Sequence, residues 1–94
     1  SVEVEVESFL DEVPDEQHPD GIIRIGAVIF VERDSQKGII IGKGGKALKR
    51  VGTQARKEIE AFFGKPVFLQ LFVKVDKDWR SSQTRLRHYG YDLN

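Results

Sequence analysis

Residues 35–50 of the chain read SQKGIIIGKGGKALKR, and this segment is the most informative part of the sequence. A run of isoleucines leads into the tetrapeptide Gly42-Lys43-Gly44-Gly45, and a basic sequence with helix-forming residues follows at once. Glycine permits positive φ angles and lets another molecule approach the backbone closely. A helix that begins after such a loop directs the positive end of its dipole to the same place. These features favour a single-stranded nucleic acid, which offers both phosphates and exposed bases.

Charge is distributed very unevenly along a chain whose formal net charge is zero. Residues 1–34 carry ten acidic and two basic side chains, whereas residues 35–57 carry seven basic side chains and no acidic one. Residues 58–94 are nearly balanced, with six bases and five acids. Such asymmetry is informative about binding partners rather than about the fold. It predicts that an anionic partner meets the middle of the chain.

Composition excludes several classes of protein. Ninety-four residues make one domain, and the absence of cysteine excludes disulfides and thiolate metal sites. No apolar run approaches the roughly 20 residues of a membrane span, so we expect a cytoplasmic protein. The acidic segment 11–20 lacks the spacing of a calcium loop, and His18 and His88 have no nearby nucleophile or ligand cluster. We therefore expect no metal, no cofactor and no catalysis.

Hydrophobic patterning predicts three strands and two main helices. Valines alternate with glutamates from Val2, an acidic loop follows over 11–20, and strands are expected over 22–32, as the central strand, and over 67–75. A short helix over 36–41, capped by Asp34 or Ser35, and a longer helix over 46–63, ended by Gly64, lie between them. The buried stripe of the longer helix is expected to comprise Leu48, Val51, Ala55, Ile59 and Phe62.

The order of these elements defines the fold class. The first two strands follow each other and form an antiparallel pair, whereas the two helices between the second and third strands make that pair parallel. The prediction is an α+β domain: a three-stranded mixed sheet with helices on one face. Ser81 or Ser82 is expected to cap a last short helix, which carries Leu86 and Tyr89 and is anchored by Trp79 and Tyr89.

The glycine loop between two helices, inside a strand-helix-helix-strand frame, resembles the GXXG loop of a type II KH domain, which clamps about four nucleotides of backbone. More narrowly, residues 31–33, residues 35–45, Trp79-Arg80 and Gly90-Tyr91 resemble the C-terminal KH domain of the bacterial Era GTPase family. This resemblance implies binding to the single-stranded 3′ end of small-subunit ribosomal RNA during assembly of the small ribosomal subunit.

Two departures from the family pattern bear on domain organisation. The family's GTPase domain is missing, and Gly38 to Lys43 do not fit the spacing of a phosphate loop, so GTP hydrolysis is not carried over to this chain. The family's KH domain also begins with a helix, whereas this chain begins in a strand. We expect residues 1–94 to be a single KH domain, a C-terminal fragment that lacks its first helix. Its parent protein would bind GTP, and the GTPase domain would be a partner.

The candidate RNA-binding residues come from the loop, the helices beside it and the last strand. We expect the glycines to admit phosphates, the cations to neutralise them, and the isoleucines to form part of an apolar floor, with at least one isoleucine in the core. The strand over 68–72 would form the opposite wall. The candidates are Gly42, Lys43, Gly44, Gly45, Lys46, Lys49, Arg50, Ile39, Ile40, Ile41, Gln70 and Phe72. Two alternatives stay open: a KH-like domain for protein–protein interaction, and another KH-type RNA-binding protein.

Overall fold

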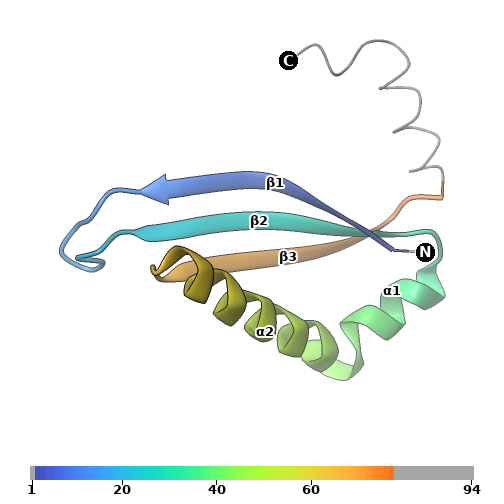
Figure 1. Ribbon diagram of the computed structural model, residues 1–94. Coiled ribbons are helices and arrows are strands. Elements are labelled where there is room, and N and C mark those ends of the chain that lie inside the picture. Colours follow the sequence, from blue (N-terminus) through green and yellow to red (C-terminus); the bar gives the residue numbers. More distant parts are fainter. Residues whose placement is uncertain (1, 78–94) are drawn as a thin grey trace, which may run out of the picture.

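A computed structural model describes residues 2–77 of the chain. In Figure 1 both helices lie on one side of a three-stranded sheet. The predicted order of strands and helices is confirmed, and the helix expected after Ser81 lies outside the described residues. The elements are β1 (Glu3–Glu12), β2 (Ile22–Val31), α1 (Asp34–Ile41), the 3₁₀ turn η1 (Lys43–Gly45), α2 (Lys46–Phe63) and β3 (Val67–Val75).

The sheet is mixed, as predicted. Its strand order is β1-β2-β3, with β1 antiparallel and β3 parallel to the central strand β2. Because β2 has a neighbour on each side, it carries nearly all of the buried side chains. These are Ile22, Ile23, Ile25, Ala27, Val28, Ile29 and Val31, joined by Val67 of β3. A core cluster of Ile23, Ile25 and Val67 packs against Ile59 of α2 and Leu69 of β3.

Strand β1 is longer than predicted. Asp11 and Glu12, expected in the acidic loop, are its last two residues and pair with β2. Each carboxylate forms an ion pair: Asp11 Oδ1 lies 2.9 Å from Nζ of Lys65, and Glu12 Oε2 lies 2.9 Å from Nε of Arg24. Arg24 lies on the neighbouring strand and Lys65 just before β3, and opposite charges beside the strand in this way offset the low strand propensity of acidic residues.

The first helix also begins earlier than predicted. Its N-cap is Arg33 rather than Asp34 or Ser35. The side chain of Gln36 folds back, and its Oε1 accepts the backbone N–H groups of Glu32 at 2.9 Å and Arg33 at 3.0 Å. A glutamine at the third helical position thus reaches back to satisfy the N–H groups of the N-cap residue and of the residue before it, as the third residue of a capping box does.

The second helix has the predicted bounds, but only part of its predicted buried stripe is covered. Gly64 ends the helix with φ 68°, and its N–H donates to the carbonyl of Glu60 at 2.8 Å. Val51 is 52% exposed and Phe62 is 82% exposed, which corrects the prediction for both residues. The reason is that α2 packs along β3, at one edge of the sheet. One margin of the apolar stripe therefore meets the sheet, and the other margin faces solvent.

Candidate nucleic-acid interface

Gly42 makes the sharp turn between the two helices. Its N–H donates to the carbonyl of Gly38 at 2.9 Å and so closes the last turn of α1. Its φ of 75° with ψ of 177° falls in a region that is essentially restricted to glycine. A Cβ atom at this position would lie 2.6 Å from Cβ of Ala47. Conformation and space therefore both require glycine here.

The rest of the loop presents bare backbone to solvent. Gly44, with φ 61°, and Gly45, with φ 77°, adopt left-handed conformations, and a Cβ at either residue would meet no atom within 4 Å. The loop winds into the 3₁₀ turn η1, which was not expected from the sequence, and the N–H of Gly45 donates to the carbonyl of Gly42 at 3.2 Å. Lys43 and Gly44 are both exposed. The loop thus carries one cation beside a backbone that a large anion can approach.

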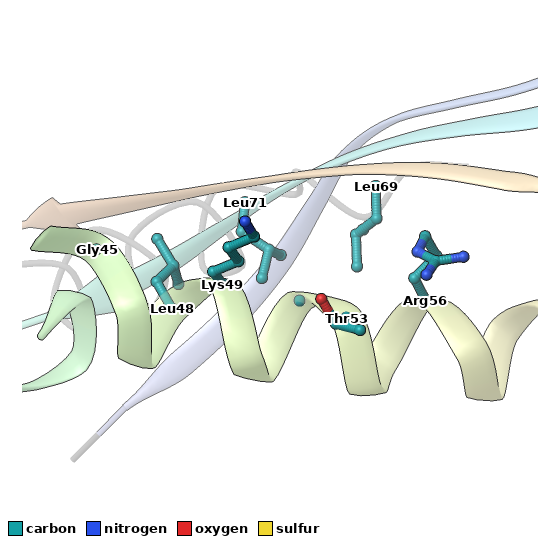
Figure 2. A pocket seen from close by; sticks show the side chains of 8 residues that line it. Gly45, Leu48, Lys49, Thr53, Arg56, Leu69 and Leu71 are labelled. Atoms are coloured by element: carbon teal, nitrogen blue, oxygen red, sulfur yellow. The ribbon is translucent and has the colours of Figure 1, made fainter.

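A groove of about 340 Å³ starts at this loop and runs between α2 and β3. Figure 2 shows its two walls: Leu69 and Leu71 point from β3 toward the helix, and the other labelled side chains come from the helix side. Gly52 lies on the helix wall, where an added Cβ would be 3.4 Å from Cδ1 of Leu71 on the strand wall. The lining residues are Gly45, Leu48, Lys49, Gly52, Thr53, Arg56, Leu69 and Leu71.

The backbone of β3 contributes hydrogen-bonding groups beside the groove. The N–H of Ile23 donates to the carbonyl of Pro66, and the N–H of Asp76 donates to the carbonyl of Val31. In a parallel pair, bonding residues of one strand alternate. The even-numbered residues of β3 therefore bond β2, and the backbone groups of Val67, Leu69, Leu71 and Val73 point to the open edge. At the start of this edge, the carboxylate of Glu60 accepts the N–H of Val67 at 3.0 Å.

The charges around the groove are cationic near the loop and paired at the far end. Lys46 and Lys49 are exposed on the first turns of α2. Nη1 of Arg56 lies 2.9 Å from Oε1 of Glu60, four residues further along the helix. The hydrogen bond from the N–H of Val67, and then the charge of Arg56, hold the pKa of Glu60 below its ordinary value of 4.5.

Not all predicted site residues come together. The glycine loop, Lys46 and Lys49 do, but Arg50 lies on another side of α2, in a shallow hollow lined also by Val51 and Glu58. Gln70 and Phe72 are exposed on the sheet face opposite Leu69 and Leu71, because successive side chains of a strand alternate. Strand β3 does form the wall opposite α2, as expected.

The isoleucine run departs most from prediction. Ile39 is 77% exposed, Ile40 and Ile41 are only partly buried, and none of the three lines the groove. The expectation that at least one would be a core residue is wrong. The eight-residue helix α1 lies at the end of the sheet, so it has little apolar surface to pack against.

Sequence reasoning missed residues that line the groove. These are Leu48, Gly52, Thr53, Arg56, Leu69 and Leu71. A signal was available for the polar ones, since Lys46, Lys49, Thr53 and Arg56 recur at steps of three and four and so share one helix face. Strand β3 was expected as the opposite wall, but its site residues were assigned to the face of Gln70 and Phe72, whereas Leu69 and Leu71 line the groove.

The sheet order, the two helices on one face and the glycine loop between them define a KH domain, and the chain belongs to that family. Residues 5–80 match the KH domain family. The narrower resemblance to the Era family is also confirmed, because the curated relatives that the chain matches include proteins named GTPase Era. The protein of Geotalea uraniireducens is 50% identical over 92 residues, which are 98% of this chain and 29% of the relative. That of Coxiella burnetii is 61% identical over 71 residues, 76% of this chain and 24% of the relative.

Solved structures agree with this assignment. Era in complex with MgGDPNP and nucleotides 1506–1542 of 16S ribosomal RNA has a TM-score of 0.76 and 40% sequence identity, covering 97% of this chain and 29% of that one. A variant of Aquifex aeolicus Era bound to GDP·AlF4⁻ gives the same values. The chain thus spans less than a third of the length of these relatives.

In residues 2–77 there is no group of three or more His, Cys, Asp or Glu side chains placed to hold a metal ion. Within the same part of the chain, no helix combines the length and the apolar character needed to cross a membrane.

Proposed function

We propose that this chain binds single-stranded RNA, with the sugar-phosphate backbone against the glycine loop and the bases in the groove between α2 and β3. The observation that carries this proposal is the continuity of the two features: an exposed loop with bare backbone and Lys43 opens directly into the groove. Lys46 and Lys49 lie beside the path that phosphates would take from the loop. A KH loop clamps about four nucleotides.

In this arrangement, the apolar wall and the open edge of β3 receive the bases. Leu69 and Leu71 offer side chains to base faces, and the backbone of the same residues offers one donor and one acceptor each at the strand edge. Such groups bind unpaired bases and not a duplex, whose base edges are already paired. Single strands are therefore preferred.

We infer further that the target is the 3′ end of small-subunit ribosomal RNA, in the context of small-subunit assembly in the cytoplasm. Support comes from the Era complex with nucleotides 1506–1542 of 16S ribosomal RNA, to which this chain is 40% identical over 97% of its length. In a longer parent protein, a GTPase domain and the small ribosomal subunit would be the partners. GTP hydrolysis itself is not assigned to this chain.

Fluorescence anisotropy with labelled oligonucleotides tests the proposal. The chain alone, without GTP, should bind a single-stranded oligomer of the ribosomal 3′ end more tightly than a scrambled oligomer and than the same sequence as a duplex. Three or four neutralised phosphates predict a slope of log affinity against log salt near −2 to −3. Equal binding to the duplex would contradict the proposal that the groove holds unpaired bases. A flat salt response would contradict the proposal that the loop holds phosphates. Equal binding to the scrambled oligomer would contradict the ribosomal RNA as the target.

A further inference from the structure

Arg56 differs in position and environment from the other cations of the site. It lines the groove eleven residues beyond Gly45, which corresponds to about 16 Å along the helix, at the end remote from the glycine loop. Lys43, Lys46 and Lys49 are exposed, whereas the Arg56 side chain is 38% exposed and in contact with a carboxylate. Its role therefore need not be the neutralisation of phosphate at the loop.

The guanidinium of Arg56 is held in place through two successive hydrogen bonds. Nη1 donates to Oε1 of Glu60 at 2.9 Å, and Oε2 of the same carboxylate accepts the backbone N–H of Val67 at 3.0 Å. Val67 is a core residue, 5% exposed, so this connection ends in the buried core of the fold. Because the pKa of Glu60 is lowered, its carboxylate is ionised at neutral pH. Within residues 2–77, one of the five N–H donors of Arg56 is used, and four remain.

We propose that Arg56, positioned by Glu60, reads one base of the bound strand and selects a base with two adjacent acceptors. This inference rests on the proposed RNA binding. An arginine offers only donors in a planar fork, and it pairs best where two acceptors lie side by side. Guanine has such a pair in O6 and N7, and cytosine has one in O2 and N3. Adenine places its amino group beside each ring acceptor on those edges, and uracil has an N–H between its two carbonyls, so both are disfavoured.

Binding to four RNA heptamers tests this assignment. The heptamers consist of uridine with a central guanine, cytosine, adenine or uracil, and the proteins are the unmodified chain, Arg56→Lys and Lys46→Gln. The unmodified chain should bind the guanine or the cytosine heptamer about 5- to 100-fold more tightly than the other two sequences. Comparison of the guanine heptamer with the cytosine heptamer shows which acceptor pair Arg56 prefers, O6 and N7 of guanine or O2 and N3 of cytosine. Arg56→Lys keeps the charge but loses the fork, so its preference should fall below about twofold with the salt slope unchanged.

The matched control is Lys46→Gln, which removes a cation near the loop. It should weaken all four heptamers by a similar factor and reduce the salt slope by about one. If Arg56→Lys instead weakens all four heptamers by a similar factor and reduces the salt slope, Arg56 contacts phosphate and the assignment is overturned. It is also overturned if the unmodified chain binds all four heptamers alike, or if Arg56→Lys retains the full preference.

A second variant tests the positioning by Glu60 and covers the case in which Arg56→Lys is not folded. Glu60→Gln keeps an oxygen that accepts the N–H of Val67 but loses the charge that holds Arg56. Its base preference should fall at least threefold while its mean affinity for the four heptamers stays within about twofold. An unchanged preference would overturn the positioning role. Failure of the unmodified chain to bind any heptamer would instead refute the proposed RNA binding, a result distinct from binding without preference.

Discussion

Replacing both Lys43 and Gly44 by aspartate tests the glycine loop as the phosphate site. The structure predicts that this double variant folds. Gly44 has φ 61°, and a Cβ atom there meets nothing within 4 Å, so the only cost is the left-handed backbone. Aspartate is among the side chains that accept this conformation most readily, at about 1 kcal/mol. For a domain of this size, the melting temperature should fall by roughly 4–8 °C.

The effect on binding should be much larger than the effect on stability. The two substitutions change the charge of the loop by −3, and both new carboxylates lie within the Debye length of about 8 Å from any phosphate held there. Like charges brought together at an interface cost several kcal/mol, and each 1.4 kcal/mol is a factor of ten. We therefore expect RNA affinity to fall at least 100-fold.

A matched control exists at the opposite end of α2. Gly64 has φ 68°, and a Cβ there also meets no atom within 4 Å, while Lys57 is exposed on the same helix. The double variant Lys57→Asp with Gly64→Asp makes the same change in charge and imposes the same backbone conformation. Because these residues do not line the groove, its RNA affinity should fall less than about fivefold.

Circular dichroism and thermal melting are recorded on the samples used for anisotropy, at the same salt concentration. The reasoning is refuted if the loop variant is folded and binds within fivefold of the unmodified chain. It is refuted equally if the control variant is folded and loses as much affinity as the loop variant, because net charge would then explain both results.

Three further substitutions test the geometry of the site. Gly42→Ala should lower the melting temperature by about 8 °C or more, since its backbone is restricted to glycine at a cost near 2 kcal/mol and the new methyl would lie 2.6 Å from Cβ of Ala47. Gly52→Ala should raise stability by roughly 0.5–1 kcal/mol in urea unfolding but weaken RNA binding, because the methyl meets Leu71 at 3.4 Å, inside the groove. Glu60→Gln should be less stable than the unmodified chain at pH 7. A carboxylate with a lowered pKa contributes stability above its ordinary pKa of 4.5 and loses that contribution as the pH falls through the folded value, so the stabilities of the two proteins should converge as the pH is lowered below 4.5.

Local patterns were sufficient to predict the elements themselves. The near-continuous apolar run that becomes β2 identified a central strand, and α2 begins and ends at the predicted residues. Its end is decided by Gly64, and the turn between the helices is decided by Gly42, which adopts a backbone that other residues avoid. Such features depend on a few neighbouring residues and can therefore be predicted from the sequence.

The exact ends of other elements depended on longer contacts. Asp11 and Glu12 belong to β1 because Lys65 and Arg24 lie beside them, and neither partner is near them in the sequence. Helix α1 begins at Asp34 because the side chain of Gln36 caps it from within. Composition alone favoured a loop at Asp11 and Glu12, and a helix that begins later than α1 does.

The features of the candidate site also divide into those set by local sequence and those set by tertiary packing. By itself, the sequence determined the glycine loop, the cations that follow it and the amphipathic character of α2, because each depends on spacing along one segment. Only the tertiary structure decided that Arg56 lines the groove while Arg50 does not, and that Phe62 remains exposed. Helical periodicity shows which side chains share a face, but not which face the sheet will cover. That is decided by the packing of α2 against β3 at the edge of the sheet, where Glu60 reaches the backbone of Val67 and holds Arg56 beside the groove.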